Sequence, residues 1–391
     1  MASKFITQLR YSGALALIAA ITACGGGSYS DSQYVASGPV LSVKTAALSP
    51  TQEVAEVSSL ATGTGTLMMD PSIGNITGSI TTAGMTATAA HIHTGVAGVN
   101  GAVIIGLVQD PAVPARWNVP ANTVLTAAQQ ALFTSGGLYF NAHSAAFPSG
   151  EIRGQIGREV ALARLSGVQE VSQNTSVAVG LGAIAIDPVT KLADVTLTFS
   201  GVTPTGAHIH SGAIGANGPI IFNLGTPGAS GYAASGLQFS DAQLTEFRAK
   251  GQYFNIHSAA FPGGEIRGQM GYQVRIASMN GAQENPPVAT ASTGLGFAAY
   301  DPETKNAFAQ LTITGFTPSA AHLHRGVTGV NGAIIVGLQQ NATNAQTWAT
   351  AGLVPLADAD ATLLITQGLY LNAHSGAFPT GEVRGQLLAN R

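Results

Sequence analysis

Cysteine is almost absent from this sequence: Cys24 is the only one among 391 residues. A single thiol cannot close an intramolecular disulfide, and it cannot supply the several thiolates of a cysteine-rich zinc site. The stability of the chain must therefore come from packed cores. Any metal site must be built from histidine, carboxylate or amide groups.

Charged side chains are also scarce. They make up 9% of the chain, and the formal net charge is −3. A protein that binds nucleic acid needs a basic surface to neutralise phosphates. The composition excludes a broad surface of this kind, so we expect no nucleic-acid partner.

The N-terminus has the order of features that an export signal requires. Lys4 and Arg10 precede "SGALALIAAITA", an apolar run too short to cross a bilayer as a helix. The following "ITAC" resembles the lipobox of bacterial lipoproteins, in which cleavage exposes the cysteine for acylation. This resemblance implies a signal peptide at 1–23, lipidation of Cys24 and a flexible tether at 24–44. We expect an exported protein anchored in the membrane of a bacterial cell envelope, on the periplasmic or cell-surface face. A chance cysteine after an ordinary signal peptide is the alternative.

Glycine, in contrast, is abundant, with 49 residues, and short segments rich in Val, Ile, Thr and Ala lie between turn residues. "DVTLTFSGVT" and "FAQLTITGFT" alternate apolar and polar residues, as half-buried strands do. The Asn-Gly of "GVNGAVIIGL" is typical of a tight hairpin turn. These patterns predict an all-β, antiparallel structure.

The chain is an internal triplication. "TQEV", "VQEV" and "AQEN" place Glu53, Glu170 and Glu284 at spacings of 117 and 114 residues, by subtraction of their numbers. Each copy closes on a motif such as "GLYFNAHSAAFPSGEIRGQI". We therefore predict three tandem antiparallel β-sandwich domains of Greek-key-like type, each of about 114 residues. Their expected bounds are 45–158 (copy 1), 159–273 (copy 2) and 274–391 (copy 3).

Each copy has at most one short helical window. Thr126 lies three residues before Gln129, and Ser240 lies three before Gln243. Both pairs fit a capping box, in which the two side chains bond reciprocally to the backbone of the first turn. In copy 3 the window begins at Asp358 instead.

All nine histidines belong to the repeated motifs. Side chains alternate faces along a strand, so His91 and His93 lie on the same face of their strand. Tyr139, Asn141 and His143 likewise lie on the same face of theirs. If the two strands adjoin, three imidazoles converge in each copy, and such a set suits copper or zinc. The candidate ligands are His91, His93 and His143; His208, His210 and His257; His322, His324 and His374.

A purely structural explanation of the same residues stays open. The histidines would then hydrogen-bond neighbouring polar groups and form a seam that fixes the register of the sheet. The glutamate and arginine that follow the turn are expected as ion-paired or capped positions. The supporting polar residues are Asn141, Glu151 and Arg153; Asn255, Glu265 and Arg267; Asn372, Glu382 and Arg384.

Taken together, the motifs "QEV", "AHIHTGVAGVNG" and "YFNAHSAAFPSGEIRGQI" resemble the CHRD domain, which is named after chordin and also occurs in bacterial exported proteins. The resemblance covers nearly all of the chain beyond the expected tether. It implies a β-rich extracytoplasmic domain that binds a protein ligand. It implies no catalytic mechanism.

A shorter stretch, "GFTPSAAHLHRG", resembles the strand of copper/zinc superoxide dismutases that carries a His-x-His copper pair. The further loop histidines, the ligand aspartate and the disulfide of those enzymes have no clear counterparts here. No phosphate loop, His-Glu-x-x-His helix or Gly-x-Ser-x-Gly elbow is present. The sequence therefore favours a non-enzymatic role over an enzymatic one.

The sequence leads to three hypotheses of function. The first is an envelope lipoprotein that displays three CHRD-like domains as a binding or structural module, with an extracytoplasmic protein as its possible ligand. The second is a periplasmic or surface protein that binds copper or zinc at one three-histidine site in each domain. The third, least favoured, is a redox enzyme like superoxide dismutase. The sequence does not fix the oligomeric state.

Overall fold

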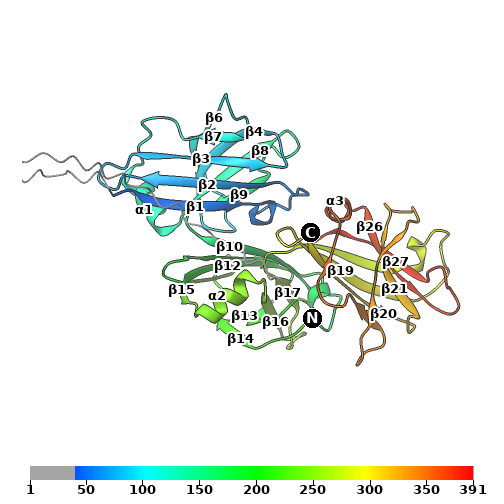
Figure 1. Cartoon of the computed structure of the whole chain (residues 1–391). Coiled ribbons are helices and arrows are strands. Elements are labelled where there is room, and N and C mark those ends of the chain that lie inside the picture. The colour runs from blue at the N-terminus through cyan, green and yellow to red at the C-terminus, as the bar shows by residue number, and fades with distance from the viewer. Residues whose placement is uncertain (1–39, 391) are drawn as a thin grey trace, which may run out of the picture. The chain divides into compact units, whose positions relative to one another are not determined.

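The structure is a computed structural model that describes residues 40–390. The expected signal peptide at 1–23 and Cys24 lie outside the described residues. Within 40–390, none of the helices is both long enough and apolar enough to cross a membrane. Figure 1 shows the strands of copy 1 in blue to teal, those of copy 2 in green and those of copy 3 in yellow to red.

Copy 1 contains two antiparallel sheets, with strand orders β1-β2-β3-β7-β6 and β5-β4-β8-β9. Its helical elements are a 3₁₀ turn, η1 (Pro50–Gln52), and one α-helix, α1 (Ala127–Ser135). Its strands are β1 (Ser42–Leu48), β2 (Thr62–Met69), β3 (Ile76–Ala83), β4 (Ala87–Thr94), β5 (Val103–Gly106), β6 (Val108–Gln109), β7 (Arg116–Asn118), β8 (Leu138–Ser144) and β9 (Ile152–Gln155).

In copy 2 the equivalent strands form one continuous sheet, in the order β14-β13-β16-β17-β10-β11-β12-β15, because β10 pairs with β17 through Ser166 and Arg267. Its helical elements are η2 (Gly167–Gln169) and α2 (Asp241–Arg248). Its strands are β10 (Glu159–Ser166), β11 (Val179–Ile186), β12 (Leu192–Ser200), β13 (Pro204–Ser211), β14 (Ile220–Asn223), β15 (Tyr232–Gln238), β16 (Gln252–Ser258) and β17 (Ile266–Gln269).

Copy 3 has the same arrangement, with β18 paired to β27 through Asn280 and Arg384. Its helical elements are η3 (Gly281–Gln283) and α3 (Asp358–Ile365). Its strands are β18 (Gln273–Asn280), β19 (Thr293–Asp301), β20 (Asn306–Thr314), β21 (Ala320–Arg325), β22 (Ile334–Gly337), β23 (Gln339–Gln340), β24 (Thr347–Ala349), β25 (Val354–Pro355), β26 (Leu369–His374), β27 (Val383–Gln386) and β28 (Leu388–Ala389).

Each sandwich closes around its own apolar core. In copy 1, Leu67 and Ile80 from one sheet meet Ile92, Phe140 and Ile152 from the other, and all five are fully buried. The alternation of apolar and polar residues along each strand sends these side chains inward. The predicted all-β class, the triplication and the sandwich architecture are confirmed.

The short helices begin as the sequence predicts. The side chain of Thr126 accepts a hydrogen bond from the backbone N–H of Gln129, whose own side chain accepts from the backbone of Thr126. Ser240 and Gln243 form the same capping box in copy 2. The helix of copy 3 begins at Asp358 without a side-chain cap.

The first strand starts earlier than expected. β1 begins at Ser42, which pairs with Met69 in β2, so the last three residues of the segment assigned to the tether, 42–44, belong to the sheet. Their alternation of half-buried and exposed side chains continues the pattern of the rest of β1. Backbone pairing with β2 decides this boundary, and local composition does not reveal it.

Candidate functional site

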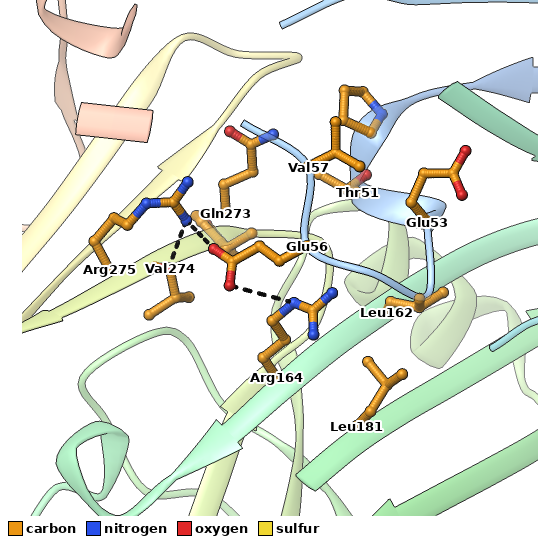
Figure 2. A pocket seen from close by; sticks show the side chains of 12 residues that line it. Thr51, Glu53, Glu56, Val57, Leu162, Arg164, Leu181, Gln273, Val274 and Arg275 are labelled. Carbon is orange, nitrogen blue, oxygen red and sulfur yellow. Dashed lines mark hydrogen bonds and ion pairs between the residues drawn. The ribbon is translucent and has the colours of Figure 1, made fainter. Parts of the chain in front are cut away.

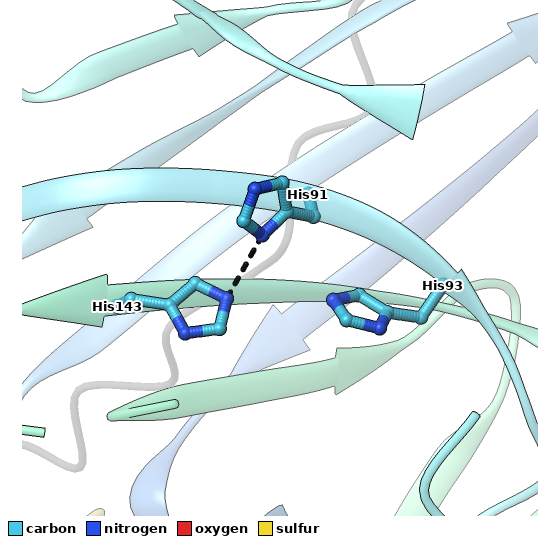
Figure 3. Close-up of side chains that lie close together, drawn as sticks. All are labelled: His91, His93 and His143. Atoms are coloured by element: carbon cyan, nitrogen blue, oxygen red, sulfur yellow. Dashed lines mark hydrogen bonds between the residues drawn. The ribbon is translucent and has the colours of Figure 1, made fainter. Parts of the chain in front are cut away.

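In copy 1, the three histidines come from two adjacent strands. β4 pairs with β8 so that His91 lies opposite Asn141 and His93 lies opposite Tyr139. The imidazoles of His91, His93 and His143 therefore share one face of the sheet, as Figure 3 shows. The reverse face carries Ile92 and Phe140 into the core, where both are fully buried. The two strands adjoin, so the three imidazoles of copy 1 converge as expected from the sequence for adjacent strands.

The same arrangement is found in all three copies. In each triad, one ring nitrogen per histidine lies within 4.8 Å of those of the other two. The centroids of the first and third rings are 4.8 Å apart in copy 1, 5.0 Å in copy 2 and 4.8 Å in copy 3. Those of the second and third rings are 6.3 Å apart in every copy.

Backbone carbonyls fix the orientation of two rings in each triad. In copy 1, His93 Nδ1 lies 3.0 Å from the oxygen of Gly101, and His143 Nδ1 lies 3.1 Å from that of Pro148. A carbonyl only accepts, so each Nδ1 carries the proton, and each Nε2 of the neutral rings has a free lone pair. The equivalent pairs are His210–Gly218, His257–Pro262, His324–Gly332 and His374–Pro379.

These lone pairs point to one place. His91 Nδ1 and His143 Nε2 are 3.0 Å apart, and the corresponding atoms of His322 and His374 are also 3.0 Å apart. Because His143 Nε2 is an acceptor, His91 Nδ1 donates to it. His93 Nε2 is buried nearby and has no hydrogen-bond partner among the described residues.

Copy 2 has no internal hydrogen bond within its triad. His208 Nδ1, His210 Nε2 and His257 Nε2 are all buried, and none has a hydrogen-bond partner among residues 40–390. Buried polar groups in folded proteins are normally paired, because an unpaired one costs about 1 to 3 kcal/mol. Three unpaired nitrogens at one point therefore indicate a group that the protein itself does not supply.

The spacing fits a small metal ion. Zinc binds imidazole nitrogen at about 2.0 to 2.1 Å, so two nitrogens on one ion are at most about 4.2 Å apart. The nitrogens of each triad lie within 4.8 Å of one another, so small rotations of the rings bring all three into range. The carbonyls that hold the outer nitrogens resemble the partners that orient histidine ligands in metalloproteins.

The imidazoles are held in the neutral form that a metal needs. Burial lowers the pKa of His91, His93 and His143 from the ordinary value of 6.5. Burial has the same effect on the pKa values of five candidate ligands in copies 2 and 3: His208, His210, His322, His324 and His374. Protons therefore compete less for these nitrogens than for those of a free histidine.

Behind the second histidine lies a stack of three side chains that sequence reasoning missed. The ring of His93 stacks on Tyr139, with centroids 4.8 Å apart and planes at 12°. The guanidinium carbon of Arg153 lies 3.6 Å from the centroid of the same Tyr139 ring. The same stack contains Tyr253 with Arg267 and Tyr370 with Arg384. Its only sequence signal is the recurrence of Tyr-x-Asn-x-His and Glu-x-Arg in each copy.

Glu151 and Arg153 bind different partners rather than each other. Arg153 donates to the carbonyls of Val96 and Val99, whereas Glu151 accepts from the hydroxyl of Ser59 at 2.6 Å. The position of Arg153 over Tyr139 directs its guanidinium toward the loop that follows β4. Of the two expectations for these residues, ion-paired or capped positions, the ion pair is not formed among the described residues of copy 1. In copies 2 and 3, Glu265 accepts from Ser176, and Glu382 accepts from Thr290 and Ser292.

A buried glutamate and an asparagine complete the polar network. Glu53 accepts from Asn141 Nδ2 at 3.0 Å, and Glu170 and Glu284 accept from Asn255 and Asn372. Burial raises the pKa of Glu53 to about 7, although Arg153 and Asn141 act in the opposite direction. The pKa values of Glu170 and Glu284 are also raised to about 7. The recurrence of Gln-Glu at the start of each copy is the sequence signal for this group.

A small cavity, lined by none of the nine histidines, lies where η1 and the segment after it meet copies 2 and 3. Figure 2 shows Glu56 there, between Arg164 and Arg275. Its volume is about 30 Å³, whereas pockets for organic ligands measure roughly 300 to 1,000 Å³. This cavity has room only for water-sized molecules. Among the described residues, the triads are therefore the better candidates for a ligand site.

The comparisons with known proteins agree with this architecture. The family model described as "CHRD domain" matches residues 44–156, 162–270 and 276–387. Searches of curated proteins and of solved structures found no match. The three matched segments span most of the chain and coincide with the three sandwiches. The chain therefore belongs to the CHRD-domain family, of which it carries three tandem copies.

Proposed function

We propose that each CHRD domain of this chain binds one copper or zinc ion through its three histidines. The observation that carries this proposal is the triad of copy 2, where three buried ring nitrogens converge and none has a partner among the described residues. Neutral imidazole nitrogen is a good ligand for either metal. Three protein ligands leave one coordination position open, as in zinc sites that bind a water molecule or a substrate.

A structural seam accounts less well for this geometry. A seam stabilises a sheet through satisfied hydrogen bonds, and unpaired buried acceptors work against it by about 1 to 3 kcal/mol each. In copies 1 and 3, one hydrogen bond joins the first and third rings, but His93 Nε2 and His324 Nε2 have no partner within residues 40–390. An ion replaces these missing contacts with three coordinate bonds.

The stoichiometry of binding tests the proposal. The purified full chain, stripped of metal and titrated with Zn²⁺ or Cu²⁺ by calorimetry at neutral pH, is expected to bind three ions. The His208→Ala/His210→Ala variant removes two ligands of copy 2 only, so binding falls from three ions to two. The Gln238→Ala variant changes a side chain of β15 outside the triad and keeps all three.

Two results contradict the proposal. One is the lack of saturable binding by the parent chain, and the other is an unchanged stoichiometry in the His208→Ala/His210→Ala variant. Far-UV circular dichroism of the variant checks that copy 2 still folds. Because copies 1 and 3 keep their ligands, they act as an internal control in the same molecule.

We also propose that the three domains are displayed from a bacterial cell envelope through a lipid on Cys24. The support is the order of Lys4, Arg10, the apolar run and "ITAC". The Cys24→Ser variant is expected to lose its membrane association and to appear in the soluble fraction after cell lysis. Fractionation followed by salt extraction measures this. A variant that stays with the membrane and resists salt would place the anchor elsewhere.

A further inference from the structure

In each copy, the loop that follows the His-x-His strand supports the triad from one side. In copy 1 this loop, residues 95–101, supplies the Gly101 carbonyl that accepts from His93 Nδ1. It also supplies the carbonyls of Val96 and Val99 that accept from Arg153. The position of the loop therefore sets the orientation of the second histidine and of the arginine in the stack.

The apex of the same loop packs against the next copy. Ala97 is 5% exposed and lies in an apolar cluster with Leu162, Ala183 and Ala185 of copy 2. Thr196 Oγ1 donates to the carbonyl of Ala97 at 3.2 Å. The loop of copy 1 is thus held by its own triad on one side and by the sheet of copy 2 on the other.

The junction between copies 2 and 3 repeats this contact with larger side chains. Ile214 occupies the position equivalent to Ala97, six residues after the first histidine. It packs against an apolar cluster that includes Phe297 and Phe308 of copy 3. The approach is close at the neighbouring Gly215, where a Cβ atom would lie 2.5 Å from Phe308. The two docked loops are therefore 95–101 and 212–218.

The corresponding positions in the loop of copy 3 and on the sheet of copy 1 are polar. In the loop of copy 3, residues 326–332, the apex residue is Thr328, which is exposed. On the sheet of copy 1, the position of Ala183 and Phe297 is taken by the half-exposed Thr66. Among residues 40–390, no sheet of another copy covers Thr328. The loop is held instead by Asn285 of its own copy, whose Nδ2 donates to the Gly329 carbonyl at 2.8 Å and whose carbonyl accepts from Asn331 Nδ2 at 2.6 Å.

We propose that each succeeding copy closes the metal site of the copy before it, so that three sites with the same ligands release their ions at different rates. This inference rests on the proposed metal binding. For an ion to leave, the second histidine must turn away, and this requires movement of the loop that holds it. Loops 95–101 and 212–218 are held on their second side by a buried apolar contact with the next copy, whereas loop 326–332 has no such contact among residues 40–390 and instead makes exposed hydrogen bonds with Asn285. The triads of copies 1 and 2 therefore release their ions slowly, and the triad of copy 3 releases its ion fast.

Chelator competition on the full chain tests this order. The chain loaded with three Zn²⁺ ions is mixed with excess EDTA, and release is followed with time. We expect one ion in a fast phase and two in slower phases, with rates that differ by at least about tenfold, or about 1.4 kcal/mol in activation free energy. A single phase for all three ions overturns the inference. A chain that takes up no Zn²⁺ overturns the proposed function instead.

A pair of matched variants assigns the phases. Ile214→Thr gives copy 2 the apex residue of copy 3, and it is expected to move one ion from the slow phases to the fast phase. Thr328→Ile gives copy 3 the apex residue of copy 2. Because this position is exposed and no sheet of another copy covers it among residues 40–390, the phases are expected to stay unchanged. Unchanged amplitudes in Ile214→Thr contradict the inference.

Amide hydrogen exchange provides a measurement that needs no metal. In the metal-free full chain, the amides of loop 326–332 are expected to exchange faster than those of loops 95–101 and 212–218. Equal exchange in the three loops overturns the inference even if metal binding is established. Because this measurement uses only the parent chain, it does not depend on whether any variant folds.

Discussion

Replacing Arg267 with alanine is expected to destabilise copy 2 by about 3 to 5 kcal/mol, the range found when one partner of a buried charge network is removed. The guanidinium is 1% exposed and lies 3.5 Å from the centroid of the Tyr253 ring. It donates to the carbonyls of Ala213 and Ala216 and to the side chain of Gln269. The substitution leaves these buried acceptors unpaired and removes the stack that supports His210.

Scanning calorimetry of the full chain measures this effect. A loss of about 3 kcal/mol corresponds to a fall of more than about 10 °C in the melting temperature of a domain this size. Arg248→Ala is the matched control, because Arg248 forms a half-exposed ion pair with Glu159 that is worth at most about 1 kcal/mol. If Arg267→Ala and Arg248→Ala have similar melting temperatures, the stack does not support copy 2.

The second large effect concerns the pH dependence that Glu170 gives to stability. Burial raises the pKa of Glu170 to about 7, from the ordinary value of 4.5. Between these two values the folded protein binds more protons than the unfolded chain, so stability falls as the pH rises. The stabilising contribution is fully present below pH 4.5 and is lost as the pH rises through about 7. Its total is on the order of 3 kcal/mol, from about 1.4 kcal/mol per pKa unit.

Glu170→Gln tests this linkage with a neutral side chain of the same shape. The glutamine still accepts from Asn255, and it cannot ionise. Relative to the parent, the variant is expected to become progressively more stable between pH 5 and pH 8. The measurement is the melting temperature of the parent and of the variant at several pH values in this range. The control is Thr245→Ala, on the exposed side of α2, whose melting temperature should change with pH as that of the parent does. If the melting temperature of Glu170→Gln changes with pH in parallel with that of the parent, Glu170 has the same pKa in the folded and the unfolded chain.

The sequence by itself determined the three copies, the all-β class and the faces of the strands. Alternation along a strand has a period of two, so "HIH" and "YFNAH" already place His91 with His93 and Tyr139 with His143. The capping boxes at Thr126 and Ser240 were equally local, because each depends on residues three apart. Features with short sequence separation were therefore within reach of pattern reasoning.

Only the tertiary structure decided that the histidines form a site. His91 and His143 are 52 residues apart, and they meet because the core residues Ile92 and Phe140 fix the register between β4 and β8. Pairing across the sheet also placed Arg153 on Tyr139 rather than on Glu151. The carbonyls of Gly101 and Pro148, which select the free nitrogens, come from backbone geometry that side-chain identity does not encode. Contacts between distant strands, and backbone groups shared by every residue type, leave no local pattern in a sequence.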